Sequence, residues 1–104
     1  MDIDTFRQMV AKTPKGFLRR YGLGNKILQE NGSVEEAVEH LTVATQLDPT
    51  HAASHLALGR ALIRLGRDAE DKPVITAGIE AVLSGRSNGG KDLVPEMQEL
   101  LRSL

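Results

Sequence analysis

The chain has 104 residues, a formal net charge of -1, and hydrophobic and charged fractions of 40% and 26%. This length and composition are typical of one folded domain and exclude an intrinsically disordered chain. The absence of cysteine excludes disulfides and thiol nucleophiles, and the near-neutral charge gives no basic footprint for nucleic acid. The acidic start lacks a signal-peptide layout, and no apolar run approaches the roughly 18 residues of a membrane span. We therefore expect a single soluble domain, 1–104, in the cytoplasm, with no nucleic-acid or membrane partner.

Apolar residues recur every three to four positions along almost the whole chain, which predicts an all-α fold. In chain order, the expected helices cover residues 1–13, 17–30, 34–47, 51–65, a segment that ends near 83, and 92–104. No useful stretch alternates apolar and polar residues, as a half-buried strand would.

Capping residues mark several helix ends. Asn31 tolerates the left-handed conformation that a helix end often needs. Ser33, followed three positions later by Glu36, fits a capping box at the start of the next helix. Asp92 is expected to cap the last helix, with Pro95 in its first turn, where a missing N–H does no harm.

Similar residues recur at a spacing of about 34 positions. Gly32 and Gly66 are 34 positions apart, as are Leu41 and Ile75. A helix-turn-helix unit of this length is the signature of tetratricopeptide repeats. The residues that carry the resemblance are Leu23, Gly24, Leu28, Gly32, Ala37, Leu41, Ala44 and Leu47-Asp48-Pro49 in the first unit, and Leu58, Gly59, Leu62, Gly66 and Ile75 in the second.

The chain thus resembles the small stand-alone two-repeat proteins of the tetratricopeptide repeat family in bacteria. The resemblance implies an α-α superhelix with one repeat at 16–49, a second at 51–83, a loop at 84–91, and capping helices at 1–13 and 92–104.

The second unit departs from the family pattern at two positions. Asp71 stands where the family has a small residue, and Pro73 lies early in the second helix of the pair. Either that helix starts near Asp71, with Pro73 in its first turn, or it is kinked.

In this family the first helix of each pair lines a concave groove that binds a partner peptide. The resemblance places Tyr21, Asn25, Leu28, Gln29, Leu56, Arg60, Ile63 and Arg64 in that groove. Because guanidinium binds carboxylates bidentately, Arg60 and Arg64 favour an acidic segment or a C-terminal carboxylate of another protein. A second interpretation pairs Arg64 with Asp68 and Arg67 with Asp71 as ordinary surface ion pairs.

These patterns predict a non-catalytic module for protein–protein interaction. The alternative is a structural protein that self-associates through its helical faces. Two repeats are few for burying a continuous core, since about three are usually needed, so a homodimer could complete the stack.

Other motifs carry weaker signals. Residues 85–92 have the G-x-x-x-x-G-K frame of a phosphate-binding loop, but Asp92 replaces the Ser or Thr and no strand precedes it. His51 and His55 could share a helix face for a metal but lack a third ligand; we expect His51 at a helix start and His55 packed between repeats. Four side chains are expected on a solvated helix face, Glu35, Glu36, Glu39 and His40. We predict no cofactor, no metal and no enzymatic activity.

Overall fold

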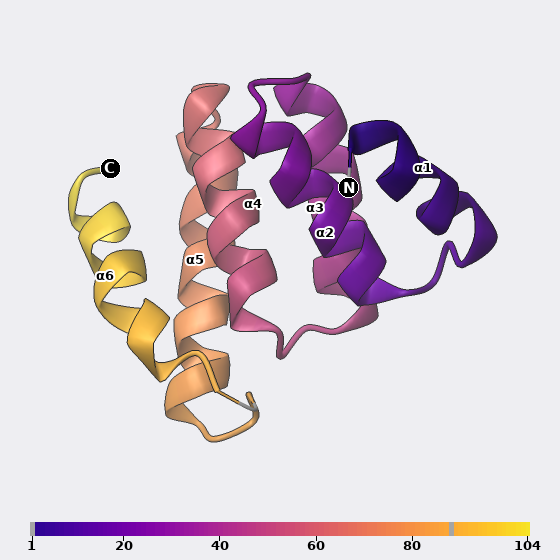
Figure 1. Ribbon diagram of the computed structural model, residues 1–104. Helices are drawn as coiled ribbons and strands as arrows, with labels where there is room; N and C mark the ends of the chain where they lie inside the picture. Colours follow the sequence, from indigo (N-terminus) through magenta and orange to yellow (C-terminus); the bar gives the residue numbers. More distant parts are fainter. Residues whose placement is uncertain (1, 88) are drawn as a thin grey trace.

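The computed structural model describes residues 2–87 and 89–104, and every regular element within them is helical (Figure 1). The elements are α1 (Ile3–Lys12), α2 (Phe17–Gln29), α3 (Val34–Leu47), α4 (Ala52–Arg64), α5 (Asp68–Leu83), the short 3-10 helix η1 (Lys91–Leu93) and α6 (Val94–Arg102). The all-α prediction is therefore confirmed. Among the described helices, none combines the length and the apolar character needed to cross a membrane.

The helices pack as consecutive neighbours. The most extensive contacts join α2 to α3 and α4 to α5, and the contact of α3 with α4 joins the two pairs (Figure 1). The first helix, α1, flanks α2, and α6 flanks α5 at the other end of the stack. The arrangement is a helical repeat with an additional helix at each end.

Small residues allow the two helices of each pair to approach closely. A Cβ atom added at Gly24 would lie 2.5 Å from Cγ of Leu41 in α3, and one added at Gly59 would collide with Ile75 in α5. Side chains in well-packed interiors have little room to move away. Glycine at these two positions therefore sets the distance between the paired helices.

Two apolar clusters form the interior. The first joins α2, α3 and α4 around Leu23, Ile27, Leu41, Leu58 and Leu62, and α1 adds Val10. The second joins α4, α5 and α6 around Leu56, Ile75, Val82, Val94 and Met97. Each end helix therefore covers apolar residues that the paired helices would leave open to solvent.

The predicted helix ends are right at α3 and wrong at α6. Ser33 Oγ accepts a hydrogen bond from the Glu36 N–H at 3.2 Å, and Asn31 has a φ of 55°. Asp92 does not cap α6, because it lies inside η1 and α6 begins only after Leu93. The extra turn of η1 brings Leu93 onto the second apolar cluster.

The structure also decides where α5 begins. It starts at Asp68, so a start near Asp71 is wrong and Pro73 lies inside the helix. Pro73 has no N–H, so α5 lacks one backbone hydrogen bond there. Asp71 is fully buried, and neither of its carboxylate oxygens has a hydrogen-bond partner among the described residues. Its side chain reaches the backbone of α4 at Gly59.

Candidate functional site

A hollow of about 160 Å³ lies between α2 and α4, which are the first helices of the two pairs, and we call it the α2–α4 hollow. Its lining consists of Asn25, Leu28 and Gln29 from α2 and Ala57, Arg60 and Arg64 from α4. Five of these six residues belong to the groove set expected from the sequence. The structure thus brings together side chains from two helices that are about 30 positions apart in the chain.

The hollow has an apolar floor and polar walls. Leu28 and Ala57 are buried, so they form the floor, while Gln29, Arg60 and Arg64 are exposed. On a helix, residues three or four positions apart share one face, which is why Asn25, Leu28 and Gln29 point the same way. A small side chain at Ala57 leaves the space above the floor open.

The charged groups on the lining are both cationic. Arg64 Nη1 donates a hydrogen bond of 3.4 Å to the Leu28 carbonyl, which ties α4 to the end of α2. Arg60 forms an ion pair with Glu96, which α6 places beside it. Lys26 in α2 forms an ion pair of 2.7 Å with Glu30, the residue that ends this helix. Neither residue belongs to the lining of the hollow.

Three residues of the expected groove set lie outside the hollow. Tyr21 packs edge-on against the ring of His51, with ring centres 5.1 Å apart. Leu56 is buried in the second apolar cluster. Ile63 is half-buried. The helical face that carries Leu56 is covered because α6 packs there, and no local spacing in α4 could have indicated that.

The arginine side chains do not make the surface pairs that one interpretation predicts. Arg67 binds Glu70 rather than Asp71, because Asp71 turns inward and is buried. Arg64 reaches back to α2 instead of pairing with Asp68. Both differences arise from contacts between helices, which the spacing within one helix does not reveal.

The two histidines of α4 have protein partners on their ring nitrogens. His51 is at the N-cap of α4, as expected, and its Nδ1 lies 2.6 Å from Ser54 Oγ. Burial lowers the pKa of His51, and Asp48 opposes that effect. His55 is buried, with Nδ1 3.0 Å from the Val74 carbonyl in α5 and Nε2 bonded to the loop before α4.

The expected solvated face of α3 is wrong for two of its four residues. Arg7 in α1 donates two hydrogen bonds to the Glu36 carboxylate, at 3.0 and 2.7 Å, and lowers the pKa of that carboxyl. His40 lies 3.3 Å from the same carboxylate and 3.1 Å from Arg20. These contacts hold α1 against the first helix pair, and the other two glutamates are exposed.

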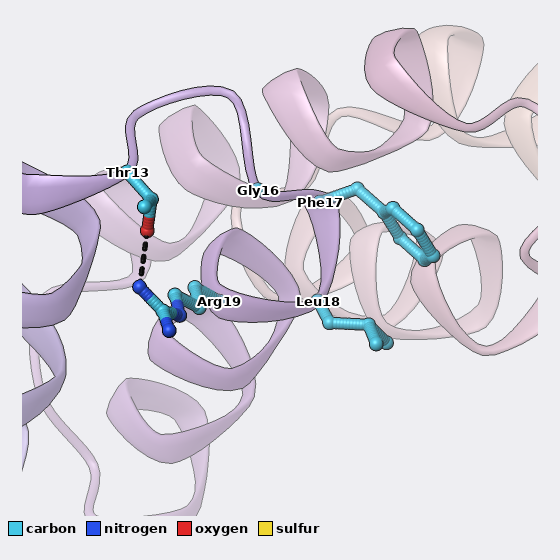
Figure 2. Close-up of a pocket in the computed structure, with 5 residues that line it drawn as sticks. All are labelled: Thr13, Gly16, Phe17, Leu18 and Arg19. Atoms are coloured by element: carbon cyan, nitrogen blue, oxygen red, sulfur yellow. Dashed lines mark hydrogen bonds between the residues drawn. The ribbon is translucent and has the colours of Figure 1, made fainter.

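Two apolar hollows lie away from the α2–α4 hollow. One, of about 260 Å³, forms at the start of α2, where Phe17 and Leu18 point away from Arg19 (Figure 2). Arg19 instead donates a hydrogen bond of 2.5 Å to Thr13 Oγ1, so this hollow offers little polar recognition. The other, of about 340 Å³, lies between α5 and α6 beside Leu83.

Comparison with known protein families finds a match over α4 and the end of α2, the helices that form the hollow. Residues 28–70, from the end of α2 into α5, match the family described as Tetratricopeptide repeat. Over this segment the chain is similar to tetratricopeptide repeats. This confirms the resemblance drawn from the repeat spacing, and five of the six residues of the α2–α4 hollow lie inside the match. Tetratricopeptide repeats generally mediate protein–protein interaction and are typically non-enzymatic. Among curated proteins, none matches the chain significantly.

Proposed function

We propose that this protein binds an acidic segment of a partner protein in the α2–α4 hollow and catalyses no reaction. The observation that carries the proposal is the set of donors around the hollow. Arg60 and Arg64 supply guanidinium groups, and Asn25 and Gln29 supply side-chain amides. Guanidinium binds a carboxylate through two parallel hydrogen bonds, so closely spaced carboxylates match this chemistry best.

The size of the hollow favours a peptide over a small metabolite. Small-molecule sites usually enclose about 300–1,000 Å³, whereas the α2–α4 hollow measures about 160 Å³. It accommodates one or two side chains of an extended segment, with the remainder lying along α2 and α4. An acidic side chain and a C-terminal carboxylate offer the same group, so both forms of ligand are compatible with the site.

The test compares two double variants that change the net charge equally. Arg60→Glu with Arg64→Glu alters the hollow, and Arg67→Glu with Arg86→Glu alters exposed arginines outside it. Fluorescence anisotropy measures binding of fluorescein-labelled hexaglutamate, with hexaglutamine as the neutral probe. Hydrogen bonds to charged groups contribute about 1.5–3 kcal/mol each, so the hollow variant should lose at least about tenfold in affinity.

Three comparisons decide the result. Loss of affinity in the hollow variant alone, with far-UV circular dichroism unchanged, supports the proposal. Equal losses in both double variants would mean that overall charge, and not this site, attracts the probe. Retained affinity in the hollow variant would overturn the assignment of the site.

A second candidate function is self-association. Leu18 and Leu83 are 58% and 70% exposed, and each borders one of the two apolar hollows. Exposed apolar patches of this kind mark interaction surfaces in many proteins. Static light scattering of the unmodified chain separates the candidates, since a species of 11.3 kDa at micromolar concentration contradicts self-association. A cytoplasmic location and a bacterial source remain predictions from the sequence.

A further inference from the structure

One of the two arginines in the α2–α4 hollow already has a carboxylate partner from the same chain. Arg60 in α4 forms an ion pair with Glu96 in α6. Arg64 has no ion pair within residues 2–87 and 89–104, and its one hydrogen bond there is donated to the Leu28 carbonyl. The hollow is therefore asymmetric, with one guanidinium held by an acid and one open to an acid from outside.

The position of Glu96 is set by its neighbours in α6. Val94 and Met97, on either side of it, are buried in the second apolar cluster against α4 and α5. Pro95 occupies the first turn and restricts the backbone there. Because these residues anchor α6, the exposed Glu96 side chain projects toward α4 at the edge of the hollow.

The pair between Arg60 and Glu96 is accessible and exchangeable. The two side chains are 46% and 44% exposed, so water and salt screen their attraction. Exposed ion pairs of this kind are weak, and a ligand carboxylate can replace one. A competing carboxylate that must first be displaced lowers the apparent affinity for the ligand.

We propose that Glu96 is a built-in competitor for acidic ligands, one that occupies Arg60 until a ligand carboxylate displaces it. This inference rests on the proposed function of the α2–α4 hollow. A ligand with a single carboxylate binds at the open Arg64 and leaves the internal pair intact. A ligand with two neighbouring carboxylates engages Arg64 and also releases Arg60 from Glu96. The contact with α6 thus reduces the gain in affinity that a second carboxylate gives a ligand.

The chain offers a matched control for this proposal. Glu99 is also on α6, and within the described part of the chain its one ion pair is with Arg102 on the same helix, at 3.5 Å with both side chains 71% exposed. Glu96→Gln and Glu99→Gln therefore remove the same charge from the same helix, but only the first frees Arg60. Anisotropy titrations use fluorescein-labelled hexaglutamate and a matched peptide with one glutamate among glutamines.

We expect Glu96→Gln to tighten binding of hexaglutamate about two- to fivefold, the range that loss of a weak exposed pair allows. Glu99→Gln should change it by much less. In an Arg60→Gln background the gain from Glu96→Gln should vanish, because the competition acts through Arg60. The affinity of the single-glutamate peptide should change little, because that peptide binds at Arg64 and leaves the Arg60–Glu96 pair intact. The ratio of hexaglutamate affinity to single-glutamate affinity should therefore rise in Glu96→Gln.

The outcomes separate this inference from the proposed function. Equal affinities of Glu96→Gln and Glu99→Gln, with binding still lost in the Arg60→Glu and Arg64→Glu variant, would overturn the role of Glu96 alone. A gain that persists in the Arg60→Gln background would overturn it as well. No binding of hexaglutamate by the unmodified chain or by Glu96→Gln would overturn both the site and its regulation.

Discussion

Replacing Asp71 with alanine should stabilise this protein at neutral pH. Asp71 is fully buried in the contact between α4 and α5, and both of its carboxylate oxygens lack a partner among the described residues. Leaving a buried polar group unsatisfied costs about 1–3 kcal/mol, and more when the group is charged. Alanine removes that cost and restores the small residue that the tetratricopeptide pattern has at this position.

Three smaller effects change this gain in the free energy of unfolding. Two of them reduce it and the third increases it. The substitution leaves a void of a few heavy atoms, which costs roughly 1 kcal/mol. It also removes a negative charge near the start of α5, where such charges contribute about 0.3–1 kcal/mol. Alanine has the higher helix propensity by up to about 0.7 kcal/mol. The net expectation is a gain of about 1 kcal/mol, which corresponds to roughly 4 °C in Tm for a chain of this size.

The gain in stability from Asp71→Ala should also depend on pH. Burial, helped by the charge of Asp68, raises the pKa of Asp71 above its ordinary value of 3.8. The folded protein therefore holds a proton that the unfolded chain has already released, so its stability falls as pH rises from 3.8 through the raised pKa. The difference between Asp71→Ala and the unmodified chain should widen over this range and be largest at neutral pH.

Urea unfolding followed by far-UV circular dichroism, at several pH values, measures this difference. Asp68→Ala is the matched control, since it removes an exposed acid from the first turn of the same helix and relieves only the minor contribution of its charge, so its gain should be much smaller. A loss of stability in Asp71→Ala at neutral pH would refute the reasoning. A gain that stays constant from acidic to neutral pH would refute the part that depends on ionisation.

Two further predictions concern His51 and the contact of α2 with α3. Burial lowers the pKa of His51, so the folded state binds its proton less tightly than the unfolded chain, and the stability present above its ordinary pKa of 6.5 should be lost as pH falls below it. His51→Phe keeps a ring beside Phe17 and Tyr21 and should flatten the dependence of Tm on pH between about 7 and 5. Gly24→Ala would place a Cβ atom 2.5 Å from Leu41 Cγ, so it should lower the free energy of unfolding by about 1–3 kcal/mol in urea titrations.

Each of these two expectations has a result that would contradict it. A pH profile of Tm that is the same in His51→Phe as in the unmodified chain would show that this ring does not carry the acid sensitivity. An unchanged urea midpoint in Gly24→Ala would mean that Leu41 has room to move, and that the close approach of α2 and α3 is not set by the glycine.

Features that depend on neighbours along the chain were predicted well from the sequence. Ser33 caps α3 and Asn31 adopts a positive φ because both act on backbone groups within a few residues. His51 is found at the start of α4 for the same local reason. The error at Asp92, and the late start that was one of two alternatives for α5, concern exact helix ends, which tertiary contacts such as the partial burial of Leu93 and the burial of Asp71 shift.

Some features of the candidate site could be predicted from the sequence, and others depend on tertiary contacts. The resemblance to the tetratricopeptide repeat family placed Asn25, Arg60 and Arg64 on corresponding helix faces, and the structure brings them to one hollow. The sequence contained no signal for Leu56 being covered or for Glu96 reaching Arg60, because both depend on where α6 packs. Contacts between residues far apart in the chain are not encoded in any local period.

At 104 residues with almost no net charge, the sequence by itself determined the all-α class, the repeat spacing and the resemblance to tetratricopeptide repeats, because helix periodicity and capping are local and the repeat is a regular spacing. Only the tertiary structure decided that Asp71 is buried without a hydrogen-bond partner among residues 2–87 and 89–104, and that Glu96 lies beside Arg60. Burial and ion pairing depend on which helices meet, and that is a property of the packed chain as a whole.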